Sequence, residues 1–292
     1  SERNDGHNYI PELYRRGVRN FVVSQVPKGY ASDYPEANFL KVVNTLEALQ
    51  RLAERHRDEF NIPIVGITGS NGKTMVKEWL HQLLSPSMFV TRSPRSYNSQ
   101  IGVPLSVWLL NEQTQVGVFE AGISQPGEML ALRDIIQPTI AVLTYLGAAH
   151  QENFESLEAK CREKIILFHD ADTIVYNGDD KTVSGVVNEY KDYKGEKLFW
   201  SFRDTKAPFF VKNVEKKGNL SIITYIYKGE EDSYSLPFID EASVTNSIIA
   251  AVVSRRLGLS AEELDKRMAL LEPVAMRLEV KEGQHGCTLI ND

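Results

Sequence analysis

The chain contains the stretch Ile64-Val65-Gly66-Ile67-Thr68-Gly69-Ser70-Asn71-Gly72-Lys73-Thr74, in which three local patterns follow one another. The first residues are mostly apolar and β-branched, which predicts a buried strand. A glycine-rich turn follows at 69–72, and apolar residues then recur at helical spacing over 73–84. Strand, glycine loop and helix in this order are typical of a loop that binds phosphate groups.

Each part of this loop has a physical role in holding an anion. Glycines let the backbone turn so that its N–H groups point inward, and the helix N-terminus adds partial positive charge. Lys73 is expected to reach the β- and γ-phosphates, and the Thr74 hydroxyl to ligate Mg²⁺. The common motif begins with glycine where this chain has Ile67, so the match is a shorter form. Its candidate nucleotide-binding residues are Thr68, Gly69, Ser70, Asn71, Gly72, Lys73 and Thr74. The structural alternative is a strand–helix turn with a chance Gly-Lys-Thr.

The composition narrows the class of protein. Hydrophobic residues make up 42% and charged residues 25% of the 292 residues, which is an ordinary balance for a globular protein. The apolar runs are too short to span a bilayer, and no secretory signal is visible. The net charge of −6 argues against a nucleic-acid partner. Only two cysteines, Cys161 and Cys287, are present, which suits a reducing compartment. We therefore expect a cytoplasmic protein with no membrane span.

Three units are expected along the chain. Residues 1–60 form a partial N-terminal unit that ends in a long helix over 39–60. Residues 61–272 form a central domain, and residues 273–292 begin a further domain. Because both ends run directly into structured sequence, we expect the chain to be a piece of a longer protein.

The central region alternates between strand and helix patterns, which predicts βαβ units. Strands are expected at 62–67, 88–91, 115–120, 139–144 and 172–176, and helices at 73–84, 101–110, 126–136, 156–169 and 179–189. The expected fold class is α/β, a mostly parallel sheet with helices on both faces. Short strands at 197–202, 208–216, 220–228 and 233–237 predict an antiparallel extension, followed by helices at 241–257 and 261–271. Ligands of such sheets lie at the carboxyl ends of the strands.

Several polar side chains fall at those ends. Glu120 ends an apolar strand, where a carboxylate is well placed for the Mg²⁺ of a nucleotide. His150 follows a tight turn after the 139–144 strand, and Lys164 lies on the next helix. Each also has a plain structural interpretation as a surface side chain. Asn98 can equally be a helix-entry residue, and Asn177 part of a turn.

Taken together, these motifs resemble the Mur ligase family. The resemblance runs through Thr68-Gly69-Ser70-Asn71-Gly72-Lys73-Thr74, Asn98-Ser99-Gln100-Ile101-Gly102-Val103-Pro104, Glu120-Ala121-Gly122, Gly147-Ala148-Ala149-His150-Gln151-Glu152-Asn153-Phe154, Asn177-Gly178-Asp179-Asp180, Asn246 and Met276-Arg277-Leu278-Glu279. The order and spacing of these motifs cover most of the chain.

The resemblance implies an ATP-dependent amide ligase of peptidoglycan precursor synthesis that works through an acyl phosphate. The opening Asp5-Gly6-His7 is most similar to the member that joins D-Ala-D-Ala to UDP-N-acetylmuramoyl-tripeptide. Other motifs resemble the ligase half of fusions with an alanine racemase. A piece lacking the C-terminal domain is expected to be inactive alone.

The resemblance also implies residue roles. Two Mg²⁺ sites are expected, the first with Thr74 and Glu120, the second with His150 and a carbamylated Lys164. The family spacing from His150 favours Lys164 over its rival Lys160. Nucleotide contacts are implied for Asn98, Asn177, Asn246 and Arg277, and catalytic roles for Lys73, His150 and Lys164.

Three other functions remain open from the sequence. A sister ligase of the same superfamily would add a single amino acid or act on folate. A nucleotide switch would use the phosphate-binding loop without ligation. The third alternative is a structural or interaction fragment.

Overall fold

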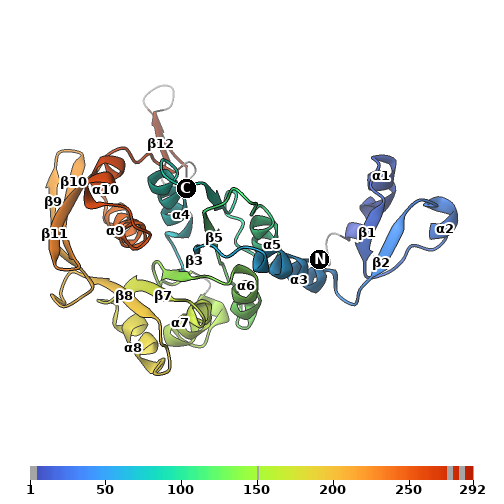
Figure 1. Ribbon diagram of the computed structural model, residues 1–292, viewed down its shortest axis with the longest axis horizontal. Coiled ribbons are helices and arrows are strands. Elements are labelled where there is room, and N and C mark those ends of the chain that lie inside the picture. The colour runs from blue at the N-terminus through green and yellow to red at the C-terminus, as the bar shows by residue number, and fades with distance from the viewer. Residues whose placement is uncertain (1–4, 150, 275–278, 283–286, 292) are drawn as a thin grey trace.

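The computed structural model describes residues 5–149, 151–274, 279–282 and 287–291. The N-terminal segment contains η1 (Gly6–Tyr9), α1 (Ile10–Arg15), β1 (Asn20–Val23), α2 (Tyr30–Asp33) and β2 (Asn38–Lys41). The two strands pair in parallel over a small apolar cluster of Ile10, Phe21 and Val23. Helix α3 (Thr45–Asp58) links this segment to the rest of the chain and packs against α5 and α6 (Figure 1).

The start of this linking helix corrects the prediction of one helix over 39–60. Residues 38–41 form β2, and the helix begins only at Thr45. The Asn44 side chain accepts hydrogen bonds from the N–H groups of Leu46 and Glu47, which satisfies two donors at the helix start. Of the apolar residues that precede Asn44, Phe39 packs against the apolar cluster of the small parallel sheet instead, and Leu40 and Val43 are exposed.

A nine-stranded sheet forms the centre of the described chain, in the order β11-β10-β9-β8-β7-β6-β3-β5-β4. Its first part alternates β3 (Ile64–Thr68), α4 (Lys73–Leu84), β4 (Val90–Arg92), α5 (Gly102–Val107), β5 (Val116–Glu120), α6 (Glu128–Ile136), β6 (Ile140–Leu143), η2 (Gln151–Asn153), α7 (Leu157–Ile165), η3 (Ile166–Phe168), β7 (Thr173–Asn177), α8 (Lys181–Glu189) and β8 (Glu196–Ser201). The strands from β4 to β8 pair in parallel. The predicted α/β class is confirmed.

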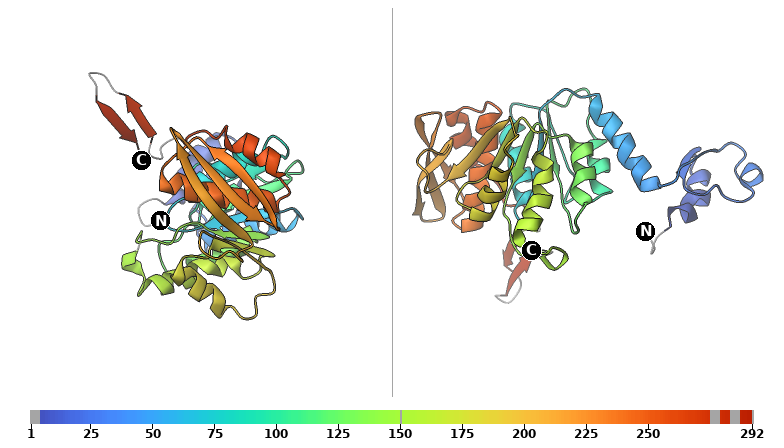
Figure 2. Two further views of the ribbon diagram at one scale, coloured as in Figure 1. Left: turned by 90° about the vertical axis from the view of Figure 1, so that its left-hand side faces the viewer. Right: turned by 90° about the horizontal axis from the view of Figure 1, so that it is seen from below.

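Helices cover both faces of the sheet, so the molecule has two large apolar cores (Figure 2). Along β3, Val65 and Ile67 face the core made with α4, α9 and α10, whereas Ile64 faces the core made with α5 to α8. Successive side chains of a strand point to opposite faces. A run of apolar residues with no polar alternation is therefore what a doubly covered strand requires.

The sheet continues into β9 (Phe209–Lys217), β10 (Leu220–Tyr227) and β11 (Glu230–Leu236), with α9 (Glu241–Arg256) and α10 (Ala261–Met268) packed on it. The last three strands are antiparallel, as predicted. The assignment of residues 197–202 to that antiparallel group is wrong. Strand β8 pairs in parallel with β7, and β9 in turn pairs in parallel with β8.

The parallel strands bring their carboxyl ends to one edge. The register sets Ile67 of β3 beside Glu120 of β5, and Thr68 beside Leu143 of β6. From β3 the chain moves to β4 and β5 on one side, and then to β6, β7 and β8 on the other. Strand β3 therefore lies at the point where the order reverses, which is where doubly wound sheets bind ligands.

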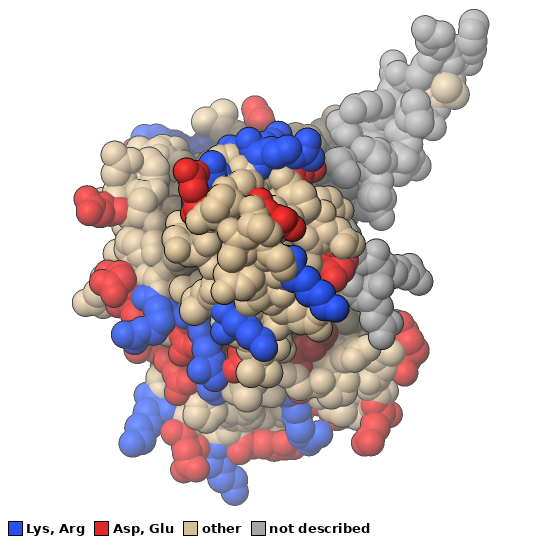
Figure 3. Space-filling view, turned by 90° about the vertical axis from the view of Figure 1, so that its right-hand side faces the viewer, with Lys and Arg blue, Asp and Glu red and all other residues tan. Residues whose placement is uncertain are grey.

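The remaining described segments are β12 (Glu279–Glu282) and β13 (Thr288–Asn291), which form an antiparallel pair. In the described residues no helix is long and apolar enough to cross a membrane. On the face that carries the N-terminal segment, basic and acidic side chains are interspersed (Figure 3). The predicted domain boundaries at 60 and 272 stay a prediction.

Candidate active site

Two glycines give the loop after β3 its shape. Gly69 has a φ of +145°, and a Cβ built there would lie 2.0 Å from Thr144 Oγ1. Gly72 has a φ of +86°, and a Cβ there would lie 2.5 Å from Asn246 Oδ1. Since a side chain would meet both strain and a clash at these two positions, only glycine allows this loop.

The loop is tied to the segment that follows β6. The Ser70 N–H donates to the Tyr145 carbonyl at 2.6 Å, and the Gly147 N–H donates to Ser70 Oγ at 3.0 Å. The Thr144 hydroxyl lies 2.5 Å from the Asn71 carbonyl oxygen and 3.2 Å from that of Thr68. Thr144 had no role in the sequence analysis, because only the tertiary structure brings it against the glycine loop.

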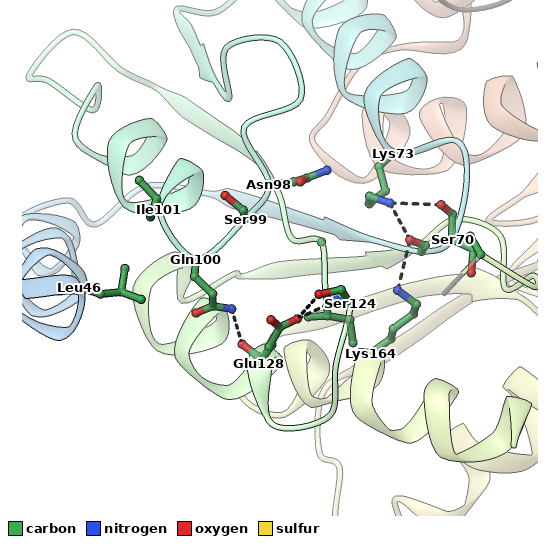
Figure 4. A pocket seen from close by; sticks show the side chains of 14 residues that line it. Leu46, Ser70, Lys73, Asn98, Ser99, Gln100, Ile101, Ser124, Glu128 and Lys164 are labelled. Atoms are coloured by element: carbon green, nitrogen blue, oxygen red, sulfur yellow. Dashed lines mark hydrogen bonds between the residues drawn. The ribbon is translucent and has the colours of Figure 1, made fainter. Parts of the chain in front are cut away.

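Lys73 and Lys164 converge on one carbonyl oxygen of the loop. The Lys73 ammonium donates to the carbonyls of Gly69 at 2.7 Å and Ser70 at 3.3 Å. Lys164 reaches the same Gly69 oxygen from α7 at 3.3 Å (Figure 4). Burial, followed by the nearby charges of Lys73 and Lys160, lowers the pKa of the Lys164 ammonium to about 7.

Lys160, the rival of Lys164, has a different position. It is buried, and its ammonium donates to the carbonyls of Gly147, at 2.5 Å, and Ala149. Desolvation lowers the pKa of this ammonium. Lys164 lines the cavity in front of the loop and Lys160 is not among the lining residues. The geometry therefore favours Lys164 as the lysine that faces a ligand. His150, the next residue after Ala149, lies outside the described residues.

Glu120 lies fully buried at the end of β5. The Thr74 hydroxyl donates to its Oε2 at 3.1 Å, and the Lys77 ammonium lies 3.0 Å from its Oε1. The predicted proximity of Thr74 and Glu120 is confirmed. Lys77 belongs to none of the motifs in the sequence, although a lysine among the apolar positions of α4 is a signal that could have identified it.

A cavity of about 370 Å³ opens in front of the phosphate loop, and Thr74 and Glu120 are not among the residues that line it. It is lined by Leu46, Gly69, Ser70, Lys73, Asn98, Ser99, Gln100, Ile101, Gly122, Ile123, Ser124, Glu128, Ala149 and Lys164 (Figure 4). Asn98 is held against the β5 end, because its carbonyl accepts from the Gly122 N–H at 2.8 Å. A Cβ at Gly122 would lie 2.8 Å from Asn98 Cγ, so glycine is needed for this approach.

Two further predicted nucleotide-binding residues, Asn246 and Asn177, are not among the residues that line the cavity. Asn246 of α9 lies against Gly72, and its amide lies 3.2 Å from Met75 Sδ. Asn177 ends β7, and its side chain accepts from the Asp179 N–H at 2.9 Å, which is the turn considered from the sequence. Arg277 lies outside the described residues.

The donor set in front of the loop fits a nucleotide with its magnesium ion. Mg²⁺ prefers oxygen ligands and usually keeps several waters and substrate phosphates in its shell. Thr74 and Glu120 offer one hydroxyl and one carboxylate oxygen 3.1 Å apart. Among the described residues no group of three or more His, Cys, Asp or Glu side chains could hold a metal ion by itself. The protein would thus supply only part of the shell, as is usual for MgATP.

A glycine loop between a parallel strand and a helix, with a carboxylate at the neighbouring strand end, defines a P-loop α/β protein. Residues 67–254 match the family model described as the Mur ligase middle domain. The chain belongs to the Mur ligase family.

Similar proteins extend this comparison over the whole chain. The UDP-N-acetylmuramoyl-tripeptide–D-alanyl-D-alanine ligase of Bacillus subtilis is 28% identical over all of this chain and 62% of its own length. MurF of Thermotoga maritima, crystallised with ADP, is 25% identical with a TM-score of 0.85, over 100% of this chain and 66% of its own. MurF of Acinetobacter baumannii, at 23% identity, shares the fold with a TM-score of 0.88, over 100% and 63%. The chain spans about 62% of the length of its curated relative.

Proposed function

We propose that this chain supplies the nucleotide-binding centre of an ATP-dependent ligase that joins D-Ala-D-Ala to UDP-N-acetylmuramoyl-tripeptide. The names of the Bacillus subtilis relative and of the ADP-bound Thermotoga structure support the reaction and the nucleotide. The observation that carries the proposal is the cavity in which the phosphate loop, Lys73 and Lys164 meet beside the Thr74–Glu120 pair.

The reaction has two steps. The carboxylate of the tripeptide attacks the γ-phosphorus of ATP, which breaks the bond to the ADP oxygen and forms an acyl phosphate. The amine of D-Ala-D-Ala then attacks the acyl carbon, loses a proton, and inorganic phosphate leaves.

The first step must bring two anions together, so positive charge has to be in place beforehand. Lys73 and the N–H groups of residues 69–74 provide it on the phosphate side. Lys73 now donates to the Gly69 and Ser70 carbonyls, and a bound phosphate would draw the ammonium toward the cavity.

Magnesium would be held by Thr74 and Glu120. A bound ion there would neutralise phosphate charge as the phosphoryl group transfers.

A second ion would use His150 and a carbamate on Lys164. Lys164 suits this modification because it is buried, faces the cavity and forms no ion pair with a carboxylate of the described chain. Carbon dioxide reacts with a neutral amine, and the carbamate would place an anionic oxygen close to the ammonium groups of Lys73 and Lys160. A ¹³C NMR spectrum of the protein in ¹³C-bicarbonate tests this modification. We expect a carbamate signal that disappears in Lys164→Met and persists in Lys160→Met.

ATP supply places the reaction in the cytoplasm. An alanine racemase fused to the ligase stays a prediction of the sequence motifs alone.

Phosphate release by the protein at the full length of its gene tests the proposed reaction. The assay combines MgATP and UDP-N-acetylmuramoyl-tripeptide with D-Ala-D-Ala, single amino acids or no amine. We expect release that depends on the dipeptide. Release with a single amino acid would assign the protein to a sister ligase, and hydrolysis indifferent to both substrates would support a nucleotide switch.

A further inference from the structure

Lys77 is a fully buried lysine that the proposed chemistry does not use. It lies on α4, three residues after Thr74, and so on the same side of the helix. Its neighbours Val76, Trp79 and Leu80 belong to an apolar core. A cation in this environment needs partners, because burying an isolated charge is costly.

Four oxygens surround the Lys77 ammonium. It donates to the Ser93 carbonyl at 2.9 Å and to the Arg95 carbonyl, both in the segment after β4. It also lies 3.0 Å from Oε1 of Glu120 and 3.0 Å from Oε1 of Glu78. The Lys77 side chain thus connects α4, the segment after β4 and the end of β5.

The two oxygens of Glu120 are divided between two partners on α4. Oε1 faces Lys77, and Oε2 accepts the Thr74 hydroxyl at 3.1 Å. The Glu120 backbone N–H is held as well, by Ser93 Oγ at 3.2 Å. Oε1 therefore lies against a cation, whereas Oε2 lies against the hydroxyl of the residue that follows Lys73 of the phosphate loop.

Stability alone is a weak reason for such a pair. Replacing a buried ion pair by apolar side chains of similar size is often neutral or stabilising. A partner that orients a ligating carboxylate, in contrast, typically contributes about 10- to 100-fold to metal affinity.

We propose that Lys77 is a positioning residue that holds Glu120 with one oxygen directed to the magnesium ion of the bound nucleotide. The inference rests on the proposed function and adds to it a residue that acts only through Glu120. Lys77 therefore affects the contribution of the metal to nucleotide binding, and not the contacts of the nucleotide with the loop.

Titration calorimetry with ADP, in excess MgCl₂ or in EDTA, separates these two contributions. The ratio of the two affinities is the metal factor. In Lys77→Met we expect the metal factor to fall about 10-fold or more. The affinity for metal-free ADP should stay within about twofold, since Lys73 and the loop N–H groups remain. A purely structural role would change both affinities or neither.

Two variants control for folding and for charge. Glu78→Gln removes the other carboxylate that contacts Lys77 and leaves Glu120 in place, so its metal factor should match the wild type. The double variant Lys77→Met/Glu120→Gln avoids leaving a buried carboxylate without its cation. Its metal factor should equal that of Glu120→Gln alone, because Lys77 has no route to the metal except Glu120.

The outcomes distinguish the inference from the function beneath it. If the wild-type protein binds ADP with the same affinity in MgCl₂ and in EDTA, the proposed function is overturned, and this inference with it. If Mg²⁺ raises the ADP affinity of the wild type, a folded Lys77→Met variant with the same metal factor as the wild type would overturn this inference alone. If Lys77→Met does not fold, a double variant with a lower metal factor than Glu120→Gln would overturn it.

Discussion

The two sides of the phosphate loop are built from opposite charges. On the β5 side, a buried carboxylate stands between a hydroxyl and an ammonium, in Glu120, Thr74 and Lys77. On the β6 side, the described chain supplies the ammonium groups of Lys160 and Lys164, whose partners are backbone carbonyls. The first side is suited to a cation, and the second is suited to an anion such as a phosphate.

This difference shows why one pocket can hold a metal and several phosphates at once. A carboxylate beside Thr74 attracts Mg²⁺, whereas buried ammonium groups whose hydrogen-bond partners are carbonyls favour phosphate oxygens. Substitutions on the two sides should therefore have different effects on metal dependence, loop position and pH dependence.

The largest effect is expected on the β5 side. Glu120→Gln keeps the shape and removes the charge, so we expect dipeptide-dependent phosphate release to fall by about 10²- to 10³-fold. Glu112→Gln, at an exposed loop position, is the matched control and should be unchanged. Activity of Glu120→Gln within a few-fold of the wild type would mean that this side does not serve the metal.

The second prediction uses the pH dependence of the β6 side. The folded state lowers the Lys164 pKa from 10.5 to about 7, so between these values the unfolded chain binds more protons. Stability of the wild type should then rise with pH across this window, by about 2 kcal/mol between pH 7 and pH 9. Lys164→Met lacks that gain.

Urea unfolding in bicarbonate-free buffer measures this difference. The stability of Lys164→Met relative to the wild type should decrease from pH 7 to pH 9. Lys181→Met, at the exposed start of α8, should show no such change. Parallel pH profiles for the wild type and Lys164→Met would contradict a buried Lys164 ammonium.

The third prediction concerns Lys160, the second buried lysine on the β6 side. Lys160→Met removes the donor to the Gly147 and Ala149 carbonyls, so the segment before His150 loses its anchor. We expect KM for ATP to rise about 10-fold, since small displacements of binding groups are costly. Steady-state kinetics with Lys181→Met as the control would show it, and an unchanged KM would limit Lys160 to a packing role.

The smallest effect concerns the contact between the two loops. Thr144→Val keeps the volume but removes the hydroxyl that lies against the Asn71 and Thr68 carbonyls. We expect a loss of about 1 kcal/mol in unfolding free energy, the usual net value of a hydrogen bond. Equal stability of variant and wild type in urea would show that the hydroxyl does not hold the loops together.

Much of the fold could be predicted because its signals are local. The apolar runs of β3, β5 and β6, and the glycines before Lys73, each determine their own element. Pairing direction is not local, so β8 could not be recognised as parallel from its residues. Likewise, the boundary at Asn44 depends on the partner strand of β2.

The candidate site shows the same division. Lys73, Thr74 and Glu120 follow from a motif and a strand end, and the structure brings Thr74 and Glu120 within hydrogen-bond distance. Lys77 and Thr144 were missed, and Lys160 was considered only as a rival of Lys164, because their roles depend on which atoms lie opposite them. Such partners come from strand order, which no spacing along the chain reveals.

The most direct test of the opposite-charge account is a crystal structure of the full-length protein with Mg²⁺ and a non-hydrolysable ATP analogue. We predict a metal ion bound by Thr74 Oγ1 and Glu120 Oε2, Lys77 still on Oε1, and the γ-phosphate facing Lys73 and Lys164. Phosphates bound outside the 69–74 loop, or a metal ion with no contact to Glu120, would contradict it.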